Sequence, residues 1–188
     1  MVSSNKEKFV VRRDTMAILP ESTSSGNYSK VIEGNHNFCV DLSPYQLMNE
    51  SLLHYCSDLK GAIRGTKTIL GNIHIPPVRI NGNPDMYWIP HISPKQADCV
   101  WIALHHIADI AYYSKKHTRV MLSNGCMINL EISIKQLQSR IDSAEQLQYK
   151  MKKITDRTGT FMLDPEYGME FIRDEYNNYR NKHLKQIF

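Results

Sequence analysis

Four cations stand out within residues 59–84, because their type and spacing suit the binding of a polyanion. They are Lys60, Arg64, Lys67 and Arg79. The stretch contains no carboxylate, and Gly61 and Gly65 bracket Arg64, where glycine lets the backbone turn tightly or approach another surface closely. A basic, glycine-jointed loop without acids fits DNA, whose phosphates attract clustered cations. The other interpretation is a solvated basic loop on an ordinary domain.

A second basic cluster contains Lys115, Lys116 and Arg119 and precedes a Ser-Asn-Gly turn at residues 123–125. No acid lies between Asp109 and Glu131. This cluster could also be a solvated loop with charged strand ends. A third cluster, Lys150-Met151-Lys152-Lys153, lies near the end of a predicted helix, and its other interpretation is favourable pairing with the helix dipole. Several such clusters on one small domain favour contact with nucleic acid more than any one cluster alone.

Patterns for catalysis and metal binding are missing from the sequence. His105 and His106 are neighbours in a predicted strand, so they should point to opposite faces and cannot share a metal ion. Cys99 lies near them, but nothing orients a base toward its thiol, and we interpret it as a core residue. No nucleotide-binding glycine motif, nucleophile motif or carboxylate pair suited to acid–base catalysis occurs. The sequence therefore predicts no enzyme, no cofactor and no metal.

The composition is that of a folded protein with mild positive charge. The chain has 188 residues and a net charge of +4, with 41% hydrophobic and 22% charged residues. These values fit one globular domain, alone or with an appendage, and a role in nucleic-acid binding then requires clustered cations. The four cysteines are widely spaced, as expected for reduced thiols. No apolar run is long enough to span a membrane and the N-terminus lacks the apolar middle of a signal peptide, so we expect a cytoplasmic protein.

The first two thirds of the chain is predicted to be rich in β-strands. Short strands are expected at residues 9–13, 15–19, 28–33, 38–42, 78–80, 86–89, 99–107, 119–122 and 127–132. Ser43-Pro44 predicts the start of one inserted helix that ends near Cys56, since it combines a hydroxyl cap with proline at the first helical position. A second short helical turn through residues 58–64 is also open, and it would place Lys60 and Arg64 on one face, although the two glycines weaken this expectation.

Two amphipathic helices are predicted to follow. From Ser133, apolar residues recur every three or four positions through Met151, which indicates a helix of about five to six turns. Asp164-Pro165 predicts the start of a last helix that runs to the C-terminus. The fold class is therefore α+β: an antiparallel sheet or partly closed barrel with one inserted helix, followed by two C-terminal helices. We divide the chain into a flexible N-terminus (1–8), a β-rich DNA-binding core (9–132) and a helical region (133–188) that packs on the core, dimerises or does both.

Several short motifs occur in a recognisable order between Ser51 and Ile132. They are Gly-x-x-Arg-Gly-Thr at 61–66, His-x-Pro-Pro at 74–77, Pro90, Cys-x-Trp-Ile at 99–102, His106, Ser-Asn-Gly at 123–125 and Leu-x-Ile-Ser at 130–133. Leu-Pro-Glu at 19–21 and residues 30–33 extend the pattern toward the N-terminus. Through these motifs most of the chain, up to about residue 139, resembles the bacterial competence transcription factor family, ComK.

This resemblance implies a DNA-binding transcriptional activator of competence genes without catalytic residues. Family members bind paired A/T-rich boxes from the minor groove, as dimers that assemble in pairs, and an adaptor hands them to a Clp protease. The family pattern has further basic residues around the first cluster, whereas in this chain Ala62 and Ile63 intervene. The implied partners are double-stranded A/T-rich promoter DNA, further copies of this chain and a Clp adaptor, and the implied location is the cytoplasm, at the nucleoid.

Binding from the minor groove suggests a role for each cation. The minor groove distinguishes A·T from G·C and little else, and narrow A-tracts concentrate negative potential. An arginine on a short glycine-flanked loop can enter such a groove, whereas a bulky recognition helix cannot. We therefore predict that Arg64 is the inserted side chain. We assign contacts with the phosphates on either side to Lys60, Lys67 and Arg79. The same row of phosphate contacts is extended by Lys115, Lys116 and Arg119.

Two other functions are left open by the sequence. A protein–protein adaptor or regulatory module would use the basic patches only for solubility. An RNA binder is disfavoured, because Tyr87-Trp88 is the nearest aromatic pair and no RNA-recognition motif surrounds it.

Overall fold

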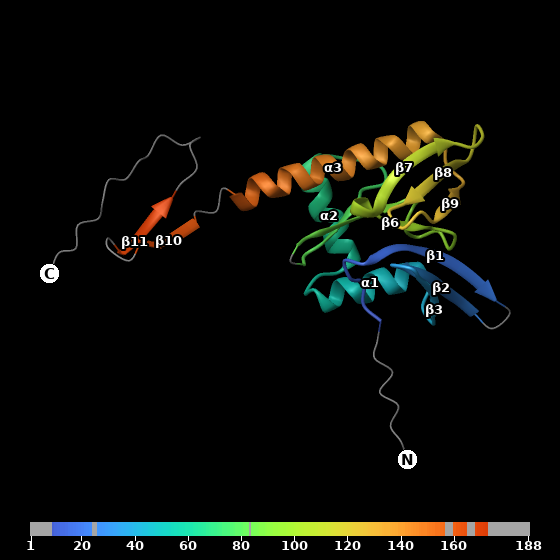
Figure 1. Ribbon diagram of the computed structural model, residues 1–188, viewed down its shortest axis with the longest axis horizontal. Helices are drawn as coiled ribbons and strands as arrows, with labels where there is room; N and C mark the ends of the chain where they lie inside the picture. The colour runs from blue at the N-terminus through green and yellow to red at the C-terminus, as the bar shows by residue number, and fades with distance from the viewer. Residues whose placement is uncertain (1–8, 24–25, 83, 157–159, 165–167, 173–188) are drawn as a thin grey trace, which may run out of the picture. The chain divides into compact units, whose positions relative to one another are not determined.

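The computed structural model describes residues 9–23, 26–82, 84–156, 160–164 and 168–172. The chain divides after Leu147 into two units, and helix α3 runs from the first into the second. In chain order the elements (Figure 1) are β1 (Thr15–Thr23), β2 (Gly26–Glu33), β3 (His36–Val40), α1 (Pro44–His54), α2 (Leu59–Leu70), β4 (Val78–Ile80), β5 (Met86–Pro90), β6 (Trp101–Ala103), the 3-10 turn η1 (Leu104–His106), β7 (Ile107–Tyr112), β8 (Thr118–Leu122), β9 (Met127–Leu130), α3 (Ile134–Asp156), β10 (Thr160–Asp164) and β11 (Gly168–Ile172).

Two antiparallel sheets build the first unit. The larger has six strands in the order β3-β2-β1-β6-β5-β4, and it joins the N-terminal meander to the later hairpin where Ala17 pairs with Ile102 and Ile18 with Trp101. The smaller has three strands in the order β7-β8-β9. The α+β class is thus confirmed, and within the described residues the sheets stay open rather than closing into a barrel.

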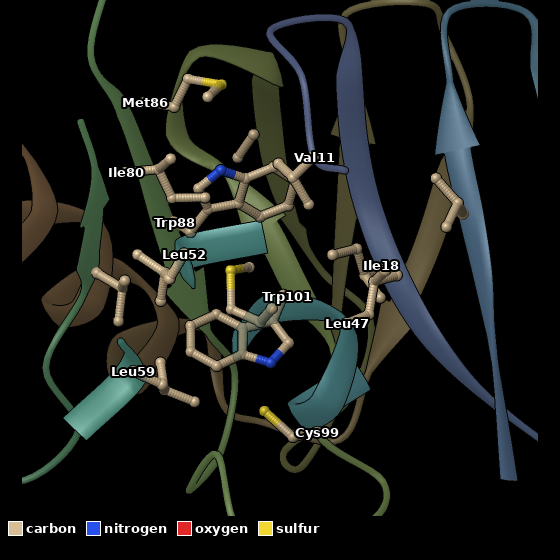
Figure 2. Packing of buried hydrophobic residues seen from close by; sticks show 14 residues of the cluster. Val11, Ile18, Leu47, Leu52, Leu59, Ile80, Met86, Trp88, Cys99 and Trp101 are labelled. Atoms are coloured by element: carbon tan, nitrogen blue, oxygen red, sulfur yellow. The ribbon is translucent and has the colours of Figure 1, made fainter. Parts of the chain in front are cut away.

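Strands β5 and β6 are buried on both faces, because alternate residues enter two different hydrophobic clusters. Trp88 and Trp101 belong to the cluster shown in Figure 2, together with residues of α1 and the start of α2, namely Leu47, Leu52 and Leu59. Ile89 and Ile102 belong to the other cluster, which includes residues of the smaller sheet and α3, namely Val120, Leu130, Leu137 and Ile141. This burial on two sides explains why both strands read as continuous apolar runs.

Helix α1 begins where the sequence predicts. Ser43 Oγ accepts a hydrogen bond from Gln46 N at 3.4 Å, and Gln46 Oε1 accepts one from Ser43 N at 3.0 Å. With Pro44 at the first helical position, this capping box fixes the start of the helix.

The first part of the basic stretch forms the regular helix α2, so the loop interpretation was wrong there, and the short helical turn left open at residues 58–64 is confirmed and continues to Leu70. Asp58 caps this helix, since its Oδ1 accepts a hydrogen bond from Gly61 N at 2.8 Å. Leu59 and Thr66 are buried, and Thr66 Oγ1 donates to the carbonyl oxygen of Pro77 at 3.0 Å. Packing and capping therefore offset the low helix propensity of the two glycines.

Gly65→Ala should raise the free energy of unfolding by about 0.5–1 kcal/mol, because alanine is favoured over glycine inside an exposed helix. A Cβ at Gly65 would meet no atom within 4 Å. The matched variant Gly61→Ala should gain less, since its Cβ would lie 3.1 Å from Asp58 Oδ2 in the cap. Urea unfolding followed by circular dichroism measures both, and equal gains would contradict this placement of the two glycines.

Three further expectations were wrong. Residues 9–13 form no strand, and the strand expected at 99–107 is divided into β6, η1 and β7. The first of the two C-terminal helices is confirmed as α3. The second was expected to run from Asp164 to the C-terminus, but Gly168–Ile172 forms the strand β11, which pairs with β10 from Thr160 opposite Ile172 to Asp164 opposite Gly168. Apart from Asp164, the rest of this expected helix lies outside the described residues. Residues 1–8, 165–167 and 173–188 lie outside the described residues.

None of the helices in the described residues has both the length and the apolar character that crossing a bilayer requires.

Candidate nucleic-acid interface

Helix α2 carries three of the predicted cations on one face. Lys60 and Arg64 are exposed and one turn apart, and the partly exposed Lys67 follows three positions later. Residues three and four apart are neighbours on a helix, so these side chains form one row, here called the α2 strip. With a rise of about 1.5 Å per residue, Lys60 and Lys67 are separated by about 10.5 Å along the axis, with Arg64 between them.

The α2 strip carries positive charge without local compensation. Helix α2 contains no carboxylate, and within the described residues none of the three cations forms an ion pair. The nearby carboxylate of Asp58 is engaged with the backbone as the helix cap. The buried face of the helix is held by Leu59 and Thr66, so the strip is presented by a fixed element. Such a row of cations suits the phosphates of a nucleic acid.

Arg79 is engaged in a different way. Its Nε and Nη2 both lie 2.8 Å from Asp85 Oδ2, and Nη2 also donates to Asn81 Oδ1 at 2.9 Å. These contacts hold the guanidinium within the β4–β5 hairpin. Arg79 therefore differs from the α2 strip because its charge is paired with Asp85, although its strand β4 packs beside α2.

The second cluster lies on the smaller sheet. Lys115 and Lys116 are exposed on the turn between β7 and β8, which a contact of 3.0 Å between Ser114 Oγ and His117 Nδ1 stabilises. Arg119, on β8, stacks over a tyrosine ring and is described further below. In Figure 1 this turn lies at the far end of the β7–β8 hairpin, well away from α2. The seven predicted site residues thus fall into two separate groups plus Arg79.

The two histidines share one partner, which corrects the expectation that they point to opposite faces. Both sit in the η1 turn, with ring centroids 4.3 Å apart, and the Nε2 atoms of His105 and His106 each lie 2.8 Å from the carbonyl oxygen of Arg13. His106 Nδ1 is also 2.7 Å from Ser123 Oγ. Burial lowers the pKa of His105. These contacts connect η1 to the chain before β1, which is a structural role.

Cys99 is buried and its surroundings keep the thiol protonated. Burial raises the pKa of Cys99 to about 12, so a reactive thiolate is strongly disfavoured at neutral pH. This agrees with the interpretation of Cys99 as a core residue. In the parts of the chain that the structure describes, no three His, Cys, Asp or Glu side chains gather in a way that could hold a metal ion.

Comparison with known proteins identifies the relatives of this chain. The family model described as ComK protein matches residues 6–156. The protein of Bacillus subtilis (strain 168) named "Competence transcription factor" is 27% identical over 164 residues, which cover 85% of each chain. No solved structure matches. Because the family match extends over well more than half of its length, the chain belongs to the ComK family.

Proposed function

We propose that this protein is a transcription regulator of competence genes that binds A/T-rich duplex DNA through the α2 strip. The observation that carries the proposal is the row of Lys60, Arg64 and Lys67 on a capped helix without carboxylates. Family membership and the name of the B. subtilis relative support the regulatory role.

The helical form of α2 changes how Arg64 would reach a minor groove. An α-helix is about 10–12 Å wide with its side chains, whereas the minor groove is about 6 Å wide, so the helix cannot enter it. The helix can instead lie across the groove. Lys60 and Lys67, about 10.5 Å apart along the axis, would then meet phosphates on the two strands, and Arg64 would reach down between them. The strong negative potential of a narrow A-tract favours a guanidinium at that position.

The family resemblance extends this proposal to assembly and control. We propose that copies of the chain bind paired boxes as dimers, that the protein acts at the nucleoid, and that an adaptor delivers it to a Clp protease. Arg79, Lys115, Lys116 and Arg119 are secondary in the proposal. Arg79 is paired with Asp85, and the other three belong to β8 and the turn before it, at the end of the β7–β8 hairpin that lies away from α2 in Figure 1.

Band-shift titrations of the full-length protein test the central proposal. A/T-rich duplexes should shift at physiological salt and G/C-rich duplexes should need more protein, and a drug that occupies the minor groove should compete. Methylation of major-groove positions should have little effect. A protein that shifts neither duplex at physiological salt would instead be a protein–protein adaptor. If methylation of the major groove weakens binding while the minor-groove drug does not, the proposed binding mode is contradicted.

Asp85→Asn should strengthen binding to all duplexes and steepen the dependence of affinity on salt by about one unit, because it releases Arg79 for a phosphate contact. Asp98→Asn is the matched control, since it removes an exposed carboxylate in the segment between β5 and β6. Fluorescence anisotropy at several salt concentrations measures both effects. Equal changes in the two variants would show that Arg79 makes no contact with DNA and that only net charge matters.

A further inference from the structure

We propose that the outer face of the sheet β7-β8-β9 is a docking surface for a protein segment that presents apolar side chains beside carboxylates. This surface, here called the outer sheet face, is formed by Asp109, Ala111, Tyr113, Arg119, Met121 and Met127. The opposite face of the sheet is buried in the cluster that includes α3. The proposal goes beyond DNA binding and does not depend on the α2 strip.

A pair of exposed methionines lies at the centre of the outer sheet face. Met121 on β8 is directly opposite Met127 on β9, and their exposed fractions are 36% and 59%. Tyr113, farther along the same face, is 54% exposed. Burial of such side chains by a partner is favourable, and flexible methionines adapt to partners of varied shape. The pair therefore offers a contact for apolar side chains.

One end of the outer sheet face carries positive charge. The guanidinium of Arg119 lies 4.7 Å from the centroid of the Tyr113 ring, and its Nε donates to Asn129 Oδ1 at 3.1 Å. These contacts hold Arg119 in place without neutralising it. Lys115 and Lys116 are exposed on the turn at the same end. A segment whose carboxylates meet this end complements its charge, and Tyr, Met and Arg are the residue types enriched in interface centres.

The arrangement of charge favours a protein over a nucleic acid. Contacts to phosphate dominate nucleic-acid interfaces, so cations would be expected along the whole surface. Instead the centre is apolar, and Asp109 stands next to Met121 in the register of β7 and β8. The Asp109 carboxylate faces solvent, with its Oδ1 accepting a hydrogen bond from Ile110 N at 2.8 Å. A phosphate backbone lying across the face would meet this negative charge.

Selection of a random peptide library displayed on phage against the full-length protein tests the proposal. We expect enriched peptides to combine Leu, Ile, Phe or Met with Asp or Glu. Their affinity should fall about tenfold or more in the double variant Met121→Ser, Met127→Ser and in Arg119→Gln. Leu53→Ser, which alters an exposed leucine on α1, should leave the affinity unchanged. Circular dichroism verifies that each variant is folded.

Arg119→Glu provides a test that does not rely on loss of binding, because it should shift the selected peptides from acidic to basic ones. Enrichment of basic peptides by the unchanged protein, or of no peptide that depends on the methionines, would overturn the proposal. Loss of affinity for DNA in the double methionine variant, with peptide binding intact, would assign the face to nucleic acid. Arg64→Ala should leave peptide affinity unchanged, so a failure of the α2 proposal would be seen separately.

Discussion

Arg64→Ala should remove most of the preference for A/T-rich over G/C-rich duplexes and weaken binding to A/T boxes by about 1–3 kcal/mol. Phosphates are the same in every sequence, whereas the potential in the minor groove is most negative over narrow A-tracts. A guanidinium at the centre of the α2 strip would sense this difference. Alanine is the best helix former, and the exposed Arg64 side chain forms no ion pair within the described residues, so the fold should be retained. Anisotropy titrations with matched A/T-rich and G/C-rich duplexes measure the ratio of affinities.

Two lysine variants serve as controls for this experiment. Lys67→Ala should weaken binding to both duplexes alike and reduce the salt dependence by about one unit, as expected for a phosphate contact. Lys95→Ala removes an exposed cation from the segment between β5 and β6 and should change affinity little. If Arg64→Ala leaves the ratio of affinities unchanged, Arg64 does not read the groove. If it lowers both affinities equally, Arg64 is a further phosphate contact.

Local signals predicted the elements that depend on local chemistry. The capping box at Ser43 marks α1, and the three- and four-residue spacing after Ser133 marks α3. The turn before β9 needs a left-handed residue, which Gly125 supplies with φ of +81°. Each of these features acts within a few residues, so the sequence alone was sufficient to find it.

Helix α2 was predicted only in part, because the sequence left open a short helical turn at residues 58–64 and gave no sign that the helix continues to Leu70. The glycines lower its helix propensity, and the stabilising contact from Thr66 to Pro77 joins residues on different elements. Asp58 immediately before the helix is a sequence signal for a helix start, because an aspartate can cap the first turn. The two glycines point the other way, and they made this signal hard to recognise. The η1 turn is similar, because the acceptor shared by His105 and His106 is the carbonyl of Arg13, more than 90 residues earlier in the chain.

The grouping of the cations depends on topology and was only partly predictable. The sequence placed Lys60, Arg64 and Lys67 close together, and helical spacing puts them on one face. It could not show that Asp85, beyond the turn that follows β4, would pair with Arg79. Tyr113 and Arg119 come together only because β7 and β8 form a hairpin. Their positions on either side of a basic turn were a signal in the sequence for this cation–π contact.

Trp101→Ala should lower the free energy of unfolding by about 3–5 kcal/mol, which is among the largest effects that we expect of a single substitution at a described residue. Trp101 is fully buried on β6, which pairs with both β1 and β5 at the centre of the larger sheet. Figure 2 shows its ring among side chains of the cluster that also contains Leu47 and Leu59. Its removal would leave a cavity between the sheet and the helices α1 and α2. Urea unfolding followed by circular dichroism measures the loss.

A milder substitution at the same position separates the contribution of volume from that of polarity. Trp101 Nε1 is buried and finds no acceptor among the described residues, and such a donor costs about 1–3 kcal/mol. Trp101→Phe removes this donor while it keeps an aromatic ring, so its loss of stability should be well below that of Trp101→Ala. Leu53→Ala, at an exposed position of α1, should change stability by about 0.5 kcal/mol or less. Equal losses in Trp101→Ala and Leu53→Ala would contradict the burial of Trp101, and equal losses in the alanine and phenylalanine variants would show that the ring itself contributes little to the packing beneath α2.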